Sequence, residues 1–491
     1  MGMIQPDVSA ESRPPLWVQE AVVAQIFPDR FRRSGRVPQQ RGLALQPWGS
    51  TPDGSGFQGG DLYGVIDGLD HLQALGITCL YLNPIFSSAA NHRYHAYDYF
   101  QVDPLLGGDA AFEALVAELK RRGMRLILDG VFNHCGRGFW AFHHLLENGP
   151  ASPYVDWFIT ERWPLQPYPA AGEPCGYHSW WCDPALPKFN HANAQVREHL
   201  LAVGRHWIER GIDGWRLDVP DEVEPEFWVE FRQQVRAVNP EAWIVGEIWG
   251  DARAWLGGAH FDGVMNYRVA WSTLGWVADG RLQPGHAREA IPYGALSGER
   301  FREVLLETLA WYRPETNQAQ LNLLDSHDVP RALHMLQGDG AALKLALVVL
   351  FCLPGVPCLY YGTEAGLSGG AEPACREAFP WRDSGAWPHD LRTFIASLAA
   401  LRQAQPALRG AELEIQVLPG PEGDQGLRLR RAAADAPAAV ELVLNRSRTA
   451  VLPLAPSTGV VLWPPALAGA ALPAVLEPQT ALVVVPTSHH R

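Results

Sequence analysis

The 491-residue sequence has few basic residues, with 40 Lys and Arg against 53 Asp and Glu and a formal net charge of -13. Nucleic acids and anionic membranes favour basic surfaces, so this balance argues against both and fits a neutral ligand. The chain also lacks an uncharged apolar run of about 18 residues, which excludes a membrane-spanning helix. The most apolar stretch, 341–361, is interrupted by Lys344 and two prolines and predicts a buried helix followed by a strand.

Cofactor and targeting signals are also missing. The chain has no P-loop and no Gly-x-Gly-x-x-Gly after a strand, so we expect no cofactor. Met1–Asp7 lacks a basic segment followed by an apolar core, so we expect no signal peptide. The seven cysteines show no zinc-like pairing, and we interpret them as reduced thiols of a cytoplasmic protein. Cys135 follows His134, yet a buried structural thiol is the favoured interpretation.

The chain is rich in apolar runs that contain β-branched residues and alternate with amphipathic helical patterns. Helical spacing is clearest at 109–122 and 195–210. The predicted strands are Ala21–Phe27, Ile77–Leu82, Arg125–Val131, Gly211–Leu217, Ala242–Glu247, Phe261–Met265, Gln320–Leu324 and Pro357–Tyr361. Strand–helix alternation repeated eight times predicts an α/β fold, a parallel (β/α)8 TIM barrel.

Two segments do not fit the alternation. After the third predicted strand, about sixty residues rich in Pro, Trp, Tyr and Gly are too long for a simple loop and predict an inserted subdomain over the carboxyl end of the barrel. After Trp381 a helical stretch, 391–404, is followed by short alternating runs that predict an antiparallel β-sandwich. The predicted divisions are a barrel from 1–132 and 191–407, an inserted subdomain at 133–190 and a β-sandwich at 408–491.

Four stretches place acids or histidines at the ends of apolar runs: Asp129–His134, Gly214–Asp218, Val245–Glu247 and Leu323–Asp328. Strand ends of a parallel barrel converge on one rim, so Asp218, Glu247 and Asp328 are expected to meet there. Glycoside hydrolysis needs two carboxyl groups across the scissile bond, about 5–5.5 Å apart if the anomeric configuration is retained. The sequence therefore predicts a glycosidase site.

Neighbouring residues support distinct roles for these acids. Arg216 lies two residues before Asp218, so both face the same side of the strand, and the guanidinium lowers the pKa of the carboxylate. Glu247 precedes Ile248 and Trp249, and an apolar neighbourhood raises the pKa of a general acid toward about 6–7. The imidazoles of His134 and His327 can donate to sugar hydroxyls, and Asp328 can hold two hydroxyls of a distorted ring. Each residue alone has a commoner structural role, so the prediction depends on the whole set.

With these residues the chain resembles the α-amylase family of glycoside hydrolases over about residues 17 to 381. The resemblance implies that Asp218 is the nucleophile, Glu247 the general acid/base and Asp328 the transition-state stabiliser. It further implies that Arg216, His134 and His327 contact the substrate. Asp129 is then a structural acid, and Tyr94 stacks on the sugar. An aromatic face against a pyranose ring suits the last of these roles.

Further motifs resemble the neopullulanase, cyclomaltodextrinase and maltogenic amylase branch of that family. They are Gln25–Phe31, Gly59–Leu62, Leu186–Asn190, Gly214–Glu222, Phe261–Tyr267 and Gly355–Gly362. This branch usually carries an N-terminal β-domain that dimerises over the site. Here the barrel begins almost at once, so we expect a more open site and a monomer, or a dimer formed in another way.

Two more departures from the branch concern the acceptor side and calcium. Pro220 and Asp221 replace an Ala-Asn pair that lines the acceptor side, which leaves linkage preference open. Relatives bind calcium through an acid-rich and Asn-rich loop, whereas Arg32–Pro38 offers cations here, so we expect this ion to be absent. Gly59 and Asp61 are retained from that site. The sequence leaves open whether Asn133 binds a different ion.

The predicted function is retaining hydrolysis of α-1,4 bonds, with α-1,6 bonds left open, in cyclodextrins, maltooligosaccharides and pullulan. An α-glucan transglycosylase would use the same three acids, and a non-catalytic glucan-binding relative is the third alternative. Aromatic residues crowd the inserted subdomain, where they serve either sugar stacking or packing: Trp163, Tyr168, Tyr177, Trp180 and Trp181.

Overall fold

The computed structural model describes residues 13–38, 42–454 and 459–486. Met1–Asp7, on which the expected lack of a signal peptide rests, lies outside these residues. In the described part of the chain, eight parallel strands close into a barrel in the order β1-β10-β9-β8-β7-β6-β5-β2. They are β1 (Val23–Ile26), β2 (Cys79–Leu82), β5 (Arg125–Gly130), β6 (Gly214–Leu217), β7 (Trp243–Gly246), β8 (Gly263–Asn266), β9 (Leu321–Asn322) and β10 (Val356–Tyr360). Each overlaps one predicted strand, and the TIM barrel is confirmed.

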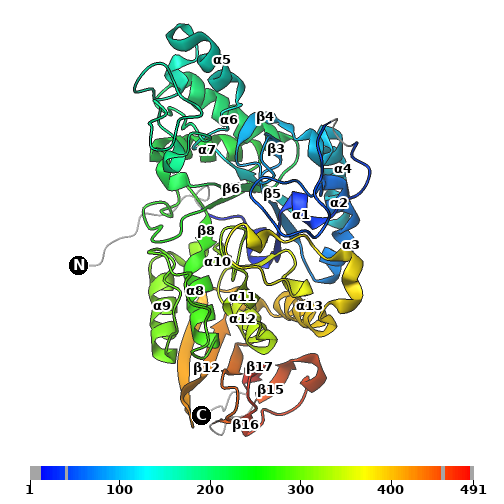
Figure 1. The fold of residues 1–491 in the computed structure, drawn as a ribbon. Coiled ribbons are helices and arrows are strands. Elements are labelled where there is room, and N and C mark those ends of the chain that lie inside the picture. The colour runs from blue at the N-terminus through cyan, green and yellow to red at the C-terminus, as the bar shows by residue number, and fades with distance from the viewer. Residues whose placement is uncertain (1–12, 39–41, 455–458, 487–491) are drawn as a thin grey trace, which may run out of the picture.

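Helices surround the barrel strands (Figure 1). In chain order the α-helices of the described residues, including α5 of the inserted segment, are α1 (Pro28–Phe31), α2 (Leu62–Asp67), α3 (Leu69–Ala74), α4 (Gly108–Arg122), α5 (Trp140–Asn148), α6 (Ala194–Glu209), α7 (Pro225–Val238), α8 (Tyr267–Val277), α9 (Gly298–Ala310), α10 (Pro314–Gln318), α11 (Ala332–Met335), α12 (Gly340–Cys352) and α13 (His389–Ala404). The apolar period explains α4, which buries Phe112, Leu115 and Leu119 and ends before Gly123 in the left-handed region at φ 68°. The four predicted helices correspond to α4, α6, α12 and α13.

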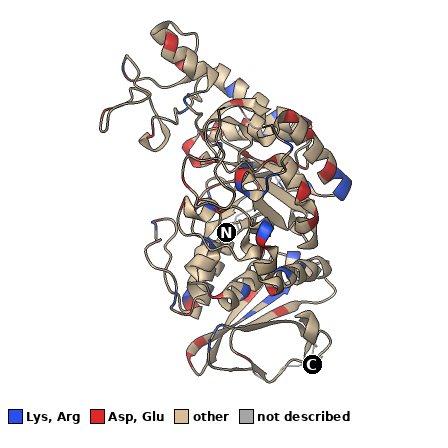
Figure 2. Cartoon of the chain, turned by 45° about the vertical axis from the view of Figure 1, so that its right-hand side comes forward, with Lys and Arg blue, Asp and Glu red and all other residues tan. Residues whose placement is uncertain are grey.

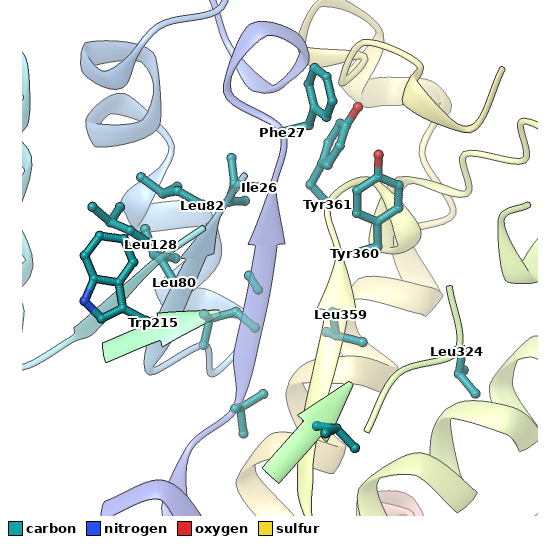
Figure 3. Packing of buried hydrophobic residues seen from close by; sticks show 14 of the residues in the cluster. Ile26, Phe27, Leu80, Leu82, Leu128, Trp215, Leu324, Leu359, Tyr360 and Tyr361 are labelled. Carbon is teal, nitrogen blue, oxygen red and sulfur yellow. The ribbon is translucent and has the colours of Figure 1, made fainter. Parts of the chain in front are cut away.

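The side chains of the barrel strands divide between two cores, because successive residues of a strand point to opposite faces. Figure 3 shows part of the helix-facing core, where Leu80, Leu82, Leu128 and Trp215 lie together. The core inside the barrel includes Val23, Tyr81, Ile127, Val245 and Met265. Polar residues that continue the interior register at the carboxyl ends of the strands therefore face one common mouth.

Two segments after barrel strands carry additional structure. Between β2 and α4 the chain forms an antiparallel hairpin of β3 (Phe86–Ser88) and β4 (Ala96–Val102), which the sequence did not predict. The inserted segment after β5 contains α5, single-turn 3-10 helices and isolated bridges, one of which joins His134 to Lys188. Aromatic rings pack its interior, with the Phe142 centroid 4.9 Å from those of Phe158 and Tyr177. Tyr177 is thus a packing residue of the insertion.

The C-terminal part forms a five-stranded antiparallel sheet and a small two-stranded one. The first has the order β11 (Glu412–Gly420), β12 (Gly423–Ala432), β13 (Val440–Asn445), β17 (Thr480–Pro486) and β15 (Gly459–Trp463), and the second pairs β14 (Leu452–Pro453) with β16 (Val475–Leu476). A core that includes Val443, Leu452, Val461 and Leu476 lies between them. The predicted antiparallel sandwich is confirmed.

Two buried arginines join this sheet to the barrel. Arg431 of β12 donates to the carbonyl of Cys352, and Arg402 of α13 donates to the carbonyl of Phe351 at 3.2 Å. Both carbonyls belong to the last turn of α12, where helical carbonyls have no partner within the helix. The guanidiniums satisfy these groups and so connect α12, α13 and β12.

Acidic and basic residues are interspersed along the ribbon in the view of Figure 2. Among the described residues, no helix combines the length and apolarity needed to cross a bilayer. All seven cysteines are free thiols, and burial raises the pKa of the Cys135 thiol well above its usual value. A thiol held neutral in this way is a packing group, in agreement with the favoured interpretation of Cys135.

Candidate active site

A cavity of about 480 Å³ lies at the carboxyl ends of the barrel strands, bounded on one side by the inserted segment. Five predicted site residues line it: Tyr94, His134, Asp218, Glu247 and Asp328. The other three contact these residues from behind: Asp129, Arg216 and His327. The structure therefore brings all eight predicted residues to one place.

Arg216 of β6 is the central cation of the site. One terminal nitrogen lies 2.7 Å from Asp129 Oδ1 and 2.9 Å from Asp218 Oδ1, and the other lies 2.8 Å from Glu247 Oε1. Register explains this contact set, because Asp129 of β5 pairs directly with Arg216 and Asp218 follows two residues later on the same face. One guanidinium thus holds three carboxylates that come from three neighbouring strands.

The net pKa of Asp218 differs from the predicted direction. Arg216 lowers it, as expected, but burial raises it more, and Glu247, Asp129 and Asp328 add repulsion. The pKa of the Asp218 carboxyl is therefore raised well above its usual value. The sequence shows one cation beside Asp218. In the fold that cation, Arg216, also contacts Asp129 and Glu247, so it lowers the pKa of Asp218 by less than burial and the neighbouring acids raise it.

Glu247 is buried and held from three sides. Besides Arg216, the indole nitrogen of Trp249 donates to its Oε1 at 3.1 Å, and the backbone nitrogen of Val219 donates to its Oε2 at 3.3 Å. Val219 adopts a left-handed backbone with φ 36°, which is rare for a β-branched residue and follows directly after Asp218. This turn lets the segment after β6 reach back to Glu247.

Asp328 lies across the cavity mouth between a cation and an imidazole. Its Oδ2 is 3.1 Å from His327 Nε2, and its Oδ1 is 3.4 Å from the guanidinium of Arg376. Burial and the charge of Glu247 raise the pKa of Asp328 to about 8, against the lowering effect of the two arginines nearby. Asp328 is therefore protonated at neutral pH and can donate a hydrogen bond.

Tyr94 and His327 form the floor beside Asp129. Their rings stack with centroids 5.4 Å apart, and the Tyr94 hydroxyl donates to Asp129 Oδ2 at 2.8 Å. The Tyr81 hydroxyl donates to the same oxygen, so Asp129 receives three donors and holds Arg216 and Tyr94 in position.

The imidazoles of the site are neutral. Burial lowers the pKa of His134 to about 3 and that of His327 well below its usual value. Gln25 Nε2 lies 2.8 Å from His327 Nδ1, which therefore accepts and leaves Nε2 as the protonated nitrogen. His134 Nε2 has no hydrogen-bond partner among the described residues, so it is available to a ligand. The adjacent Asn133 contacts His134 Nδ1 at 3.2 Å.

Sequence reasoning missed several residues of the site. Arg376, on the loop after β10, is 6% exposed, contacts Asp328 and donates to the His327 carbonyl at 2.9 Å. Gln25 and Asn83 follow the interior register of β1 and β2, and a polar residue at the end of an apolar run was the signal that could have identified both. Arg376 follows no such run, so its position depends on the loop fold alone.

The loop in which the resemblance implies a calcium site in relatives has residues that do not fit that ion. Asp29 accepts from Arg30 Nε and two backbone nitrogens, and Asp61 accepts from Gly64 N and from Ser34. Calcium needs six to eight oxygen ligands, but these carboxylates already have partners. Arg33 adds a guanidinium that donates to the carbonyls of Gln58 at 3.1 Å and Gln46 at 3.2 Å.

A closed parallel barrel with three buried acids around one arginine at its carboxyl-end mouth defines a barrel-type glycoside hydrolase. The comparison with known families agrees, because the model named Alpha amylase, catalytic domain matches residues 25–405. The chain belongs to the α-amylase family.

Related proteins cover most of the chain. A cyclomaltodextrinase from Geobacillus thermopakistaniensis is 40% identical over 438 residues, 89% of this chain and 70% of that enzyme. The structure of the cyclic α-maltosyl-(1→6)-maltose hydrolase from Arthrobacter globiformis has a TM-score of 0.84 at 37% identity and covers 97% of this chain and 100% of its own. The debranching enzyme of Nostoc punctiforme has a TM-score of 0.82 at 39% identity and covers 96% of this chain and 99% of its own. The chain is an α-glucan hydrolase of the α-amylase family.

Proposed function

We propose that the protein hydrolyses α-glucosidic bonds with retention of anomeric configuration. Asp218 attacks the anomeric carbon while Glu247 protonates the departing oxygen, and a water deprotonated by Glu247 then cleaves the glucosyl–Asp218 ester. The observation that carries this proposal is the binding of both carboxylates to the two terminal nitrogens of Arg216. Carboxyl groups held side by side suit direct attack and leave little room for the water that an inverting site needs.

The other site residues prepare the sugar and the charges. A protonated Asp328 and the neutral His134 are donors for the hydroxyls of the ring at the cleavage point, and the neutral His327 supports Asp328 and Tyr94 from behind. Because Asp328 holds a proton at neutral pH, it repels its neighbours less, which favours the ionised form that Asp218 needs as a nucleophile. Tyr94 offers its ring as a platform under the same sugar.

We infer that the substrates are neutral α-glucans such as cyclodextrins, maltooligosaccharides and pullulan. The cavity of about 480 Å³ is of the size that holds small ligands. Relatives named for cyclic maltooligosaccharides and for debranching support both cyclic and branched substrates. Seven free thiols support a reducing compartment such as the cytoplasm.

The test is hydrolysis of β-cyclodextrin and maltotriose by Asp218→Asn and Glu247→Gln. Each change should lower kcat by about 10³-fold or more, because each removes a group that acts on the breaking bond. Glu226→Gln on α7, an exposed acid away from the cavity, is the control and should keep wild-type activity. Product anomers followed by NMR should start as the α form.

Near-wild-type activity in either active-site variant, or products that start as the β form, would reject the assignment. Oligomers longer than maltotriose that dominate early in the digest would instead assign the protein as a transglycosylase.

A further inference from the structure

The cation beside Asp328 comes from a loop and not from a barrel strand. Arg376 ends a short 3-10 helix, Ala374–Arg376, on the loop after β10. Its guanidinium lies 3.4 Å from Asp328 Oδ1, donates to the carbonyl of His327 at 2.9 Å and pairs with Glu372 at 2.7 Å. A single 3-10 turn cannot fix its own place relative to the barrel, so contacts from outside the loop must do so.

A second arginine, buried outside the cavity, supplies these contacts. Arg30 of α1 is 1% exposed and does not line the cavity. Its Nη1 donates to the carbonyl of Arg376 at 3.1 Å, and its own carbonyl accepts from the backbone nitrogen of Phe379 at 2.8 Å. Two hydrogen bonds to positions three residues apart therefore fix this segment of the loop to α1.

The guanidinium of Arg30 is itself held on its other edges. Its Nε donates to Asp29 Oδ2 at 2.8 Å, and its Nη2 donates to the carbonyl of Gly56 at 2.8 Å. Asp29 is also 1% exposed, and the same Oδ2 accepts from the backbone nitrogen of Gln58 at 2.9 Å. A planar fork with all of its edges bound has little freedom to rotate, so it sets the position of the Arg376 carbonyl closely.

One aromatic ring contacts both guanidiniums. The Cζ atoms of Arg30 and Arg376 lie 5.9 Å and 5.5 Å from the centroid of the Phe27 ring. Phe27 is 1% exposed and lies beside Tyr361 at the carboxyl ends of β1 and β10 (Figure 3). Because the face of a buried ring attracts cations, Phe27 holds the two arginines at one place on the barrel rim.

Both ends of the motif Gln25–Phe31 therefore contact one part of the site. The Nε2 of its first residue lies 2.8 Å from His327 Nδ1, and Arg30 reaches the neighbouring Asp328 through Arg376. The first contact sets the tautomer of the imidazole, and the second sets the place of the cation. A shift of about 1 Å in such groups can lower a rate by about 10²-fold.

We propose that Arg30 is a positioning residue for hydrolysis: it holds the backbone of Arg376 so that the Arg376 guanidinium stays beside Asp328. This inference rests on the proposed function and adds to it a residue that touches neither the substrate nor the reacting atoms. Asp328 is proposed to hold the distorted sugar ring, so its correct placement matters more in the transition state than in the complex with intact glucan. The loss of Arg30 therefore lowers kcat more than it raises KM.

The experiment measures kcat and KM for maltotriose, and the midpoint of urea denaturation, in Arg30→Lys, Arg30→Met, Arg376→Met and the double variant Arg30→Met/Arg376→Met. Each change at Arg30 should lower kcat about 10-fold or more and change KM by less than about 3-fold. The double variant should be no slower than Arg376→Met alone, because both changes act on the same contact. Lysine keeps a positive charge beside Asp29 but lacks the fork, so Arg30→Lys supplies the same comparison, with Arg30→Lys/Arg376→Met, if Arg30→Met does not fold.

Arg33→Met is the matched control. Arg33 belongs to the loop after α1 and also donates to backbone carbonyls, those of Gln58 and Gln46, but not to that of Arg376. Arg33→Met should lower the urea midpoint and leave kcat at the wild-type value.

An equal kinetic loss in Arg33→Met would overturn the positioning role, because the loss would then follow the stability of the loop. Single losses that multiply in the double variant would also overturn it, since Arg30 would then act independently of Arg376. An active Asp218→Asn variant would refute the proposed function itself. If Asp218→Asn is inactive and Arg30→Lys keeps the wild-type kcat, only the positioning role fails.

Discussion

At the scale of single residues, the site is a cluster of acids with too few cations. Asp129, Asp218 and Glu247 share Arg216, while Asp328 relies on Arg376. Crowded carboxylates cannot all ionise at low cost, so part of the cluster holds protons. The pKa of Asp328, raised to about 8, gives this residue a proton at neutral pH, and burial raises the pKa of Asp218 well above its usual value too. The residue proposed to grip the sugar is thereby a source of instability in the free protein.

A prediction for Asp328→Asn follows from the upward direction of this pKa shift. The folded pKa lies above the unfolded value of 3.8, so Asp328 progressively destabilises the fold as pH rises from about 4 through 8. A neutral amide removes that penalty. At pH 7 the variant should unfold with about 1–2 kcal/mol more free energy than the parent, while kcat falls roughly 10³-fold. Thermal denaturation at pH 5, 7 and 8 measures the difference.

The stability gain of Asp328→Asn should grow with pH over that range. A variant that is less stable than the parent at every pH would contradict the assignment of the proton to Asp328.

The sequence predicted the shared face of Arg216 and Asp218 because the period of two in a strand is a local property. It could not predict the net pKa of Asp218, which depends on acids from other strands. Arg376 was missed for a related reason: it reaches Asp328 from a loop, and no periodicity describes where a loop side chain ends. Arg216 and Asp218, at the end of a strand, were therefore accessible to periodicity arguments, whereas Arg376 was not.

At the scale of elements, the side chain of Arg33 holds the loop after α1. The Arg33 guanidinium donates to the carbonyls of Gln58 and Gln46 and lies over the ring of Trp48. Gln58 in turn donates its backbone nitrogen to Asp29. This set joins the two halves of the loop through one side chain.

Arg33→Met should therefore lower the free energy of unfolding by about 1 kcal/mol, because two partly exposed carbonyls lose their donor. Arg36→Met is the control, since its ion pair with Asp67 is exposed and worth less than about 1 kcal/mol. Urea denaturation compares the variants. Incubation of the wild type with EDTA should leave Tm within about 1 °C, whereas a drop that calcium reverses would disprove the metal-free account.

The sequence predicted the strands that coincide with apolar runs and missed a short hairpin that has no such run. The predicted strand Gln320–Leu324 contains β9, which has only two ladder residues, yet its apolar run was sufficient to identify it. The β3–β4 hairpin was missed because Phe86–Ser88 is short and its ladder is shifted in register at two places. Such pairing depends on contacts with the barrel, which no local pattern records.

At the scale of the whole molecule, the barrel and the C-terminal sheet share buried polar contacts. Arg431 donates to the carbonyls of Cys352, Gly410 and Glu412, which come from the end of α12 and the start of β11. Arg402 adds contacts from α13 to Phe351 and Leu408. Burial lowers the pKa of both guanidiniums, a cost that these carbonyls offset. We infer that the two parts unfold together.

Arg431→Ala should separate the two parts. Three carbonyls lose their donor, so the unfolding free energy should fall by about 3 kcal/mol or more, and calorimetry should show two transitions instead of one. Arg430→Ala, the neighbour on the opposite face with an exposed ion pair to Glu414, should change little. A loss in Arg431→Ala no larger than in Arg430→Ala would count against the shared contacts.

The shortage of cations around Arg216 also has a pharmacological consequence. A sugar mimic with a protonated ring nitrogen would supply the positive charge that the acid cluster lacks, and it would resemble the charge of the oxocarbenium ion. Such inhibitors should bind more tightly than uncharged mimics of the same shape. Their advantage should widen as alkali removes the last proton from the cluster, until the inhibitor itself becomes neutral.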